Sequence, residues 1–259
     1  MKAYLNELFK RMDLIKYLVL SGLKSQHKNT YLGFFWWLLD PALQVMIYYF
    51  VVVVVFERAR GVDYGIYLAI GLIVWRWIAS SVTAATRSIT SQSAIITQVY
   101  LPKATFPLCT VMSQMINFGF GLVIVAACLL FFQIKPGAAM IWLPMVIAVQ
   151  MLLLLAVSLM VAYLSVFVRD MEMLIRHFLR LGFYGSPVIW YAGMIPERMS
   201  WLLVVNPVAS LLEAYRSIII HNTAPAIWPL AAIGVFSSLA VLLMIDIYHF
   251  FEHRIIKAL

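Results

Sequence analysis

The chain has 259 residues, of which 64% are hydrophobic and 12% are charged. A soluble domain carries about a quarter charged residues, and a single core cannot hide this much apolar surface from water. The apolar runs are continuous and about twenty residues long, the length of a membrane-spanning helix, without the alternation of a membrane β-barrel. The net charge of +8 is typical of basic loops beside anionic lipid, so no nucleic-acid partner is expected.

Residues 1–30 combine basic side chains with apolar residues three or four positions apart, such as Leu8, Ile15 and Val19. This spacing predicts an amphipathic helix. The helix either lies in the membrane interface or packs on protein, and the span that follows directly favours the interface. We therefore treat 1–30 as a cytoplasmic N-terminal interfacial helix and 31–259 as the membrane-spanning part.

The rest of the chain predicts an all-α polytopic membrane protein with six spans. Their expected ranges are 34–56, 66–86, 107–132, 141–167, 176–192 and 226–249. Gly182, Gly185 and Pro187 interrupt the fifth span. The region 192–222 is apolar in pieces but broken by prolines and charges, which fits re-entrant external helices, since irregular backbone at membrane depth must be buried in protein or line a cavity.

The loop charges predict the orientation. Thirteen Lys and Arg residues fall on the side of the two termini and five on the other, with Arg76 inside a span. By the positive-inside rule both termini are cytoplasmic. The loop 87–107, which contains the sequence QVYLPKATFP, is then cytoplasmic as well.

The loop 87–107 is too long and too apolar for a turn. Its stretch SAIITQVYL predicts a short helix that offers Ile95, Ile96, Val99 and Leu101 to a partner. Pro102 and Pro107 are expected to fix the bend into the next span. An apolar helix that faces the cytoplasm indicates a protein groove as its binding site, although a connector is the alternative.

Two ionisable residues fall inside spans at similar depth, Asp40 and Arg76. Such residues face protein or water, so the two either pair or Arg76 faces a polar conduit. Aromatic residues are the other candidates for a substrate channel, because sugar rings stack on them; Trp36, Trp37 and Trp190 are better explained as interface anchors. The candidate channel residues are Tyr48, Tyr49, Trp75, Arg76, Trp77 and Tyr184.

The sequence contains no phosphate-binding G-x-x-x-x-G-K-[ST] motif, no H-E-x-x-H and no nucleophile elbow. The five histidines are scattered beside the spans, which favours interfacial positions over a metal site. We therefore expect no catalytic residue, metal or cofactor in this chain, so any ATP hydrolysis must come from a partner.

Four motifs resemble the membrane subunit of the ABC exporters that move lipid-linked cell-surface polysaccharide. They are TYLGFFWWLLDP (30–41), IITQVYLPKATFP (95–107), VFVRDMEMLIRHFLRLGFYGSPVIWY (166–191) and MIPERMSWLLVVNPVASLLEAYR (194–216). They stand in register over most of the chain. Among these exporters the resemblance favours O-antigen over teichoic acid and capsular polysaccharide as the substrate.

The resemblance implies a homodimeric permease in the bacterial inner membrane that carries an undecaprenyl-pyrophosphate-linked glycan. Two copies of a cytoplasmic ATPase subunit would bind ATP and Mg²⁺. The residues that would couple to the ATPase are Ile95, Ile96, Gln98, Val99, Tyr100, Leu101, Pro102 and Lys103. Those that would form an external gate are Glu197, Arg198, Glu213 and Arg216. The family's usual basic-acidic pair after the proline is here Lys103 and Ala104.

Two other classes remain open. An ion-coupled transporter predicts inverted repeats and acidic residues at the midplane of the membrane, and neither is evident. A membrane-embedded glycan ligase needs a charged cluster near the exit, for which Glu197, Arg198, Glu213 and Arg216 are the candidates.

Overall fold

The computed structural model describes residues 11–26, 30–55, 62–92, 101–199 and 201–258. All regular structure in these ranges is helical. The α-helices are α2 (Met12–Gln26), α3 (Trp36–Tyr49), α4 (Val62–Arg87), α6 (Thr105–Phe131), α7 (Leu143–Phe167), α8 (Met171–Gly185), α9 (Trp201–Val205), α10 (Pro207–Ile219) and α11 (Ile227–Ala258). A π-helix, Phe50–Val55, continues α3, and short 3₁₀ turns join several of the others.

Five helical stretches are long and apolar enough to cross a membrane. They are Gly33–Val55, Tyr64–Arg87, Thr105–Phe131, Ala138–Phe167 and Ile227–Ala258. They confirm five of the predicted spans, with the fourth beginning earlier and the last extending further than expected. The continuous apolar sequence explains them, because only a helix satisfies its own backbone hydrogen bonds in lipid.

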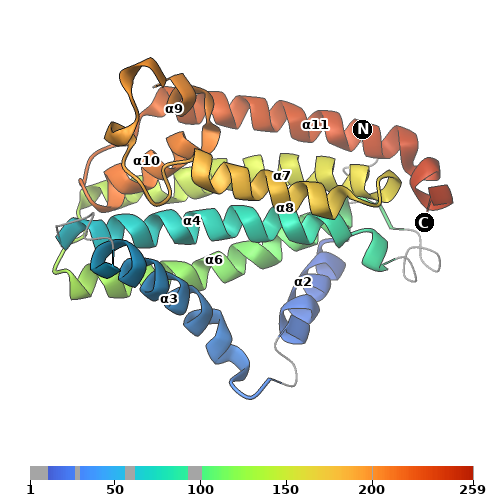
Figure 1. The fold of residues 1–259 in the computed structure, drawn as a ribbon. Helices are drawn as coiled ribbons and strands as arrows, with labels where there is room; N and C mark the ends of the chain where they lie inside the picture. Colours follow the sequence, from blue (N-terminus) through green and yellow to red (C-terminus); the bar gives the residue numbers. More distant parts are fainter. Residues whose placement is uncertain (1–10, 27–29, 56–61, 93–100, 200, 259) are drawn as a thin grey trace.

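The fifth predicted span, 176–192, is not confirmed. Its place is taken by α8, whose 15 residues cover roughly 22 Å at about 1.5 Å per residue, less than the hydrocarbon layer of about 30 Å. Gly185 and Pro187 end the helix early. In Figure 1 α8 nonetheless runs along α4 and α7, and the start of α2 and the last turns of α11 reach the same end of the bundle. We call this end the terminal end.

The core of the bundle is built around α4. In its most apolar window 72% of the residues are buried, against 6% in the first span. Its neighbours are α3, α6, α7 and α8 on its sides and α10 at the end opposite the termini (Figure 1). Small residues permit the close approach, as membrane helices require: Gly121 of α6 faces Ile73, and Gly71 of α4 faces Val188.

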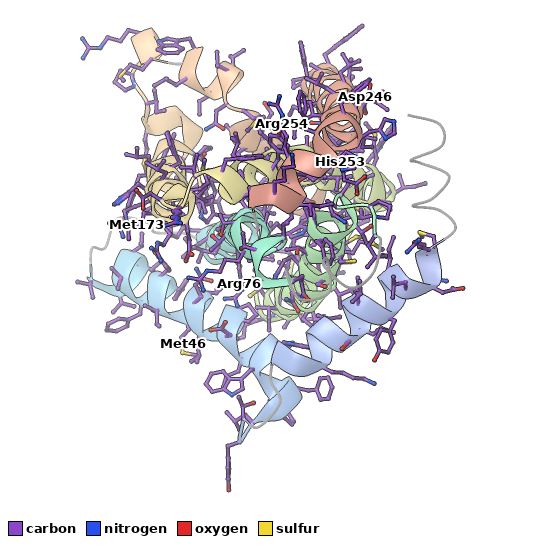
Figure 2. All side chains as sticks on the ribbon, turned by 90° about the vertical axis from the view of Figure 1, so that its right-hand side faces the viewer. Met46, Arg76, Met173, Asp246, His253 and Arg254 are labelled. Atoms are coloured by element: carbon purple, nitrogen blue, oxygen red, sulfur yellow. The ribbon has the colours of Figure 1, made fainter. Side chains whose placement is uncertain are left out.

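Helices α2 and α3 form a V beside the bundle, with its tip away from it (Figures 1 and 2). Ile15, Val19 and Leu23 bury one face of α2 against Cys109 of α6. The sequence left open whether this helix packs on protein or lies in the membrane interface, and its apolar face packs on protein. Tyr17 on the other face is exposed; the interfacial position of the helix stays a prediction, and residues 1–10 lie outside the described ranges.

We expect Gly71→Ala to destabilise the protein. A Cβ at this position would overlap the carbonyl oxygen of Val188 and approach Nη2 of Arg216 to 2.8 Å. Overpacking of this kind lowers the free energy of unfolding by about 1–3 kcal/mol. Thermal unfolding in detergent measures the effect, with Gly119→Ala as the control, because nothing lies within 4 Å of the Cβ position there. Equal midpoints for the two variants would contradict the packing described here.

Candidate functional site

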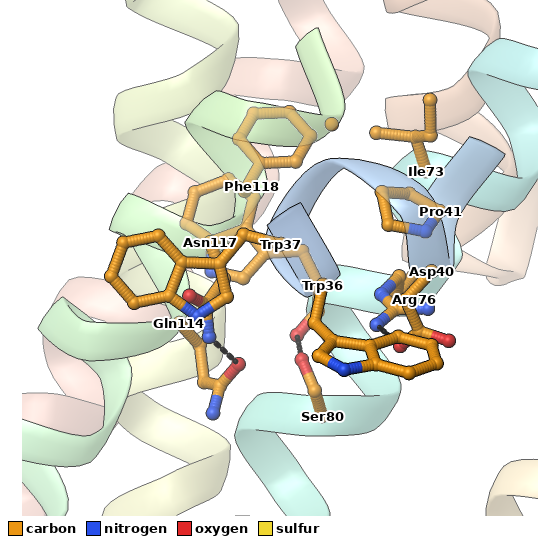
Figure 3. A pocket seen from close by; sticks show the side chains of 12 residues that line it. Trp36, Trp37, Asp40, Pro41, Ile73, Arg76, Ser80, Gln114, Asn117 and Phe118 are labelled. Carbon is orange, nitrogen blue, oxygen red and sulfur yellow. Dashed lines mark hydrogen bonds and ion pairs between the residues drawn. The ribbon is translucent and has the colours of Figure 1, made fainter. Parts of the chain in front are cut away.

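A polar cavity of about 310 Å³ lies between α3, α4 and α6. Figure 3 shows Asp40 and Arg76 on one side of it and Gln114 and Asn117 on the other. The full lining is Trp36, Trp37, Asp40, Pro41, Ile73, Arg76, Trp77, Ser80, Gln114, Asn117, Phe118 and Gly121. Charged and amide groups thus share a hollow with indole rings in helices that are otherwise apolar.

Asp40 and Arg76 form an ion pair in one wall of this cavity. Arg76 also donates a hydrogen bond from Nη1 to Oε1 of Gln44 at 3.2 Å. The pairing that their matching depth predicted is therefore confirmed. Yet the side chains of Arg76 and Asp40 remain 38% and 55% exposed, so the pair also opens onto the cavity. The structure thus shows the pairing and a polar cavity beside it; that Arg76 faces a conduit for substrate stays a prediction.

The opposite wall of the cavity carries polar residues that the sequence analysis missed. Nδ2 of Asn117 donates to Oε1 of Gln114 at 3.0 Å, one turn away on α6. Trp77 stacks on Phe118 with ring centroids 4.4 Å apart, and its buried indole N–H has no hydrogen-bond partner among the described residues. Gln114 and Asn117 three positions apart in an apolar run are the signal that sequence reading could have used.

The predicted channel aromatics divide into two groups. Trp77 lines the cavity with Arg76. Tyr48, Trp75 and Tyr184 instead surround Phe183, with ring centroids between 5.2 and 5.9 Å from it, and so join α3, α4 and α8. Tyr184 is 63% exposed, which makes it the accessible member of this second group.

Tyr49, the remaining candidate, is partly buried against the core near the end of α3. Its Cε2 lies 3.1 Å from the position that a Cβ on Gly65 would take, beside the ring of Phe132. Tyr49 therefore belongs to the contact between the end of α3 and the start of α4, and it does not line the polar cavity.

At the end opposite the termini, Arg216 of α10 is almost fully buried, with 1% exposed. Its Nη2 donates to the backbone carbonyls of Tyr67 at 3.4 Å and Val188 at 3.2 Å, and its Cζ lies 3.4 Å from the centroid of the Tyr67 ring. Burial lowers the pKa of Arg216 to about 10, so the guanidinium stays charged at neutral pH. It holds the segment around Val188 on α4.

The four predicted gate residues do not share one environment. Arg198 and Glu213 are exposed, and Arg216 is buried. The side chain of Glu197 lies outside what the structure describes. Glu213 does line a cavity of about 380 Å³ together with Tyr67, Tyr191 and Arg216, so two of the four meet at one place.

Asn206 contacts two segments at this end of the bundle, the start of α10 and the residues after α8. Its side chain caps α10 by accepting a hydrogen bond from the N–H of Val208 at 3.0 Å, and Pro207 occupies the first turn, as is typical of a helix start. Nδ2 of Asn206 donates to Oγ of Ser186 at 2.9 Å. The Asn-Pro pair thus starts α10 and ties it to the segment that follows α8.

At the terminal end, the predicted coupling residues fall in two sets. Ile95, Ile96, Gln98, Val99 and Tyr100 lie outside the described residues. Leu101, Pro102 and Lys103 are buried in the chain's own helices, and α6 begins at Thr105, where the two prolines predicted a bend. These three side chains therefore face the bundle; the contact of the segment with an ATPase stays a prediction.

The fold and the cavity define a multi-pass helical membrane protein with charged side chains at membrane depth. Among the described residues, no three His, Cys, Asp or Glu side chains come together in a way that could hold a metal ion.

Comparison with known proteins places this chain among transporter subunits, although no family model matches it. It is 31% identical over 224 residues to an O-antigen export system permease protein RfbA of Klebsiella pneumoniae, covering 86% of this chain and 85% of the relative. A second RfbA from that species is 30% identical over 223 residues. The RfbA of Myxococcus xanthus is 27% identical over 233 residues, 89% of each chain. The chain belongs to the O-antigen export permeases, the membrane subunits of ABC exporters.

We expect Arg216→Lys to loosen the end opposite the termini. Lysine keeps the charge but cannot stack on Tyr67 while it reaches both carbonyls, and the loss of one charge-assisted hydrogen bond costs about 1.5–3 kcal/mol. Thermal unfolding in detergent should show the loss. The exposed Arg198→Lys is the matched control and should unfold like the wild type. If both variants keep the wild-type midpoint, Arg216 does not clamp the segment around Val188.

Proposed function

We propose that this chain is the membrane subunit of an ABC exporter that carries lipid-linked O-antigen outward across the bacterial inner membrane. The relatives named as O-antigen export permeases support the class of cargo. The observation that carries the proposal within this chain is the Asp40–Arg76 pair, which is exposed to a cavity at membrane depth. Charges in such a place are costly unless they face protein, water or a polar substrate.

The chemistry of the cavity suits a sliding glycan. Sugar hydroxyls both donate and accept hydrogen bonds, and Arg76, Asp40, Gln114 and Asn117 supply donors and acceptors of both kinds. The indole rings of the lining offer flat apolar faces for the C–H surfaces of sugar rings. Several weak contacts of this kind hold a polymer in place without stopping its movement.

The single chain leaves polar groups of α8 exposed, which supports a homodimer. Arg176 and Arg180 are exposed beside apolar residues such as Phe178. Glu172 contacts Arg176 at 3.3 Å, but these cations would otherwise meet lipid where α8 enters the membrane. A second copy packed against this side would enclose them with the cavity in one polar path. The six-span count, which needs α8 as a crossing, is part of this proposal.

The orientation and the energy source complete the proposal. The excess of Lys and Arg on the side of the termini supports a cytoplasmic position for the terminal end. Two separate ATPase subunits bind there, at the segment 87–107, and bind ATP and Mg²⁺. The undecaprenyl-pyrophosphate-linked glycan leaves the inner leaflet through the side of the bundle next to the V of α2 and α3. Carriage of teichoic acid or capsular polysaccharide would use the same parts.

A reconstituted complex tests the coupling. We expect the chain to co-purify with the ATPase encoded beside it, and Tyr100→Ala to weaken that complex about tenfold or more, since a buried aromatic anchor of an interface contributes about 2 kcal/mol. Tyr31→Ala, an exposed tyrosine, is the control. Leu101 is unsuitable for this purpose, because a polar residue there would disturb the core. Lack of any ATPase partner would favour a ligase or an ion-coupled transporter.

The cavity itself is tested by Asp40→Asn and Arg76→Gln. Each leaves one charge without its partner, and we expect export of lipid-linked glycan in proteoliposomes to fall about tenfold or more while the ATPase stays bound, because an unpaired charge at this depth costs at least about 2 kcal/mol. The control is Lys135→Gln, an exposed cation that does not line the cavity. Variants of Glu197, Arg198, Glu213 or Arg216 that lose the joining of polymer to acceptor while export stays intact would instead support the ligase.

A further inference from the structure

Lys103 and Glu252 form a buried ion pair at the terminal end of the bundle. Nζ of Lys103 lies 3.6 Å from Oε1 of Glu252, and the two side chains are 1% and 10% exposed. Nζ also donates a hydrogen bond to the carbonyl of Leu101 at 2.9 Å. Lysine and glutamate are almost never this buried unless they are paired. The pair does not line the cavity between α3, α4 and α6, so the substrate path does not explain it.

Stability is a weak explanation for this pair. Removing two charges from water costs about as much free energy as their attraction returns, and apolar residues of the same volume often stabilise as well. A buried pair of opposite charges instead has one favoured alignment, so it fixes which two segments lie side by side. The question is therefore which two segments it joins.

The pair joins residues 101–103, the described part next to α6 of the predicted coupling segment 87–107, to the last turns of α11. Lys103 stands two residues before α6, and Glu252 follows Phe251, where the backbone (φ −106, ψ 15) leaves the helical conformation. A break of this kind marks a kink, so the end of α11 beyond Phe251 is a separate short helical piece. Glu252 is its first residue.

An apolar cluster surrounds the pair and extends the link. Leu101 and Phe106 pack in it with Tyr248 and Ile255 of α11 and Leu159 of α7. The hydroxyl of Tyr248 donates to the carbonyl of Leu159 at 3.0 Å, which fastens α11 to α7. A displacement of residues 101–106 would therefore reach α11 and α7 together.

We propose that the Lys103–Glu252 pair transmits the movement of the segment 87–107 to α11, with both side chains acting as positioning residues. The inference rests on the proposed function, in which an ATPase subunit moves that segment. Apolar contacts alone can slide past one another, whereas the ion pair holds a single register, so a shift of Lys103 carries Glu252 with it. The pair thus converts a movement at the cytoplasmic surface into one of the bundle.

The test compares export with hydrolysis in the assembled complex. The quantity measured is glycan exported per ATP hydrolysed in proteoliposomes. Lys103→Met and Glu252→Gln should each lower it about fivefold or more with the ATPase still bound, and the double variant should be no worse than either one, since residues that act as one unit are not additive. The matched control is Lys257→Met, because Lys257 is an exposed lysine of α11, the helix that contains Glu252. Variants equal to the control would overturn the inference.

A second measurement covers variants that assemble poorly. Lys103→Met with Glu252→Leu removes both charges and leaves none unpaired. Spin labels at Val168→Cys and His253→Cys, both exposed, with Cys109 and Cys128 replaced by alanine, report the distance between the α7–α8 turn and the end of α11. Holding the ATPase subunits in their ATP-bound state should change this distance in the chain with an intact Lys103–Glu252 pair. In the double variant the change should be less than half as large. A full change in both would overturn the link.

The two proposals fail differently. If the wild-type chain forms no complex with the ATPase or exports no glycan, the proposed function fails and the link with it. If wild-type export is normal and the ratio of glycan to ATP is unchanged in the variants, the link alone fails.

Discussion

The ion pair between Asp40 and Arg76 is the interaction on which the arrangement of the first half of the molecule depends. A hydrocarbon layer tolerates neither charge alone, so α3 must approach α4 at this point, although only 6% of the first span's most apolar window is buried. Pro41, next to Asp40, has no N–H to donate to the carbonyl of Trp37, which leaves α3 less regular where the cavity begins. The V of α2 and α3 then stands off the bundle and leaves a hollow beside the pair.

Two buried cations serve the ends of the bundle in a similar way. Arg216 binds the carbonyls of Tyr67 and Val188, and Lys103 binds the carbonyl of Leu101 and contacts Glu252. Each ties an irregular segment to a regular helix. Stiff helices thus form the middle of the bundle, while buried charges fix the short segments at its two ends.

The sequence predicted what depends on local pattern. Continuous apolar runs located five spans, and the matching depth of Asp40 and Arg76 predicted their pairing. Pairing across helices far apart in the sequence was harder to predict. Glu252 is a lone acid after the last span, and nothing near it in the sequence indicates Lys103 as its partner. Arg216 resembles its exposed neighbour Arg198 in the sequence, and only the packing of α10 on α4 distinguishes them. Gly185 and Pro187 limit the length of α8. Both residues are evident in the sequence, but they fit a broken membrane span as well as a short helix, so the sequence alone did not predict where α8 ends.

The claim that the polar side chains beside Arg76 face a water-filled or glycan-filled path, and not lipid, is tested most directly by thiol labelling. In a chain whose Cys109 and Cys128 are replaced by alanine, Ser80→Cys is compared with Phe236→Cys; Ser80 lines the cavity and Phe236 is an exposed apolar residue of α11. The account predicts that a charged, water-soluble maleimide labels position 80 and not position 236, and that loading with lipid-linked glycan protects position 80. Position 80 as unreactive as position 236 would contradict it.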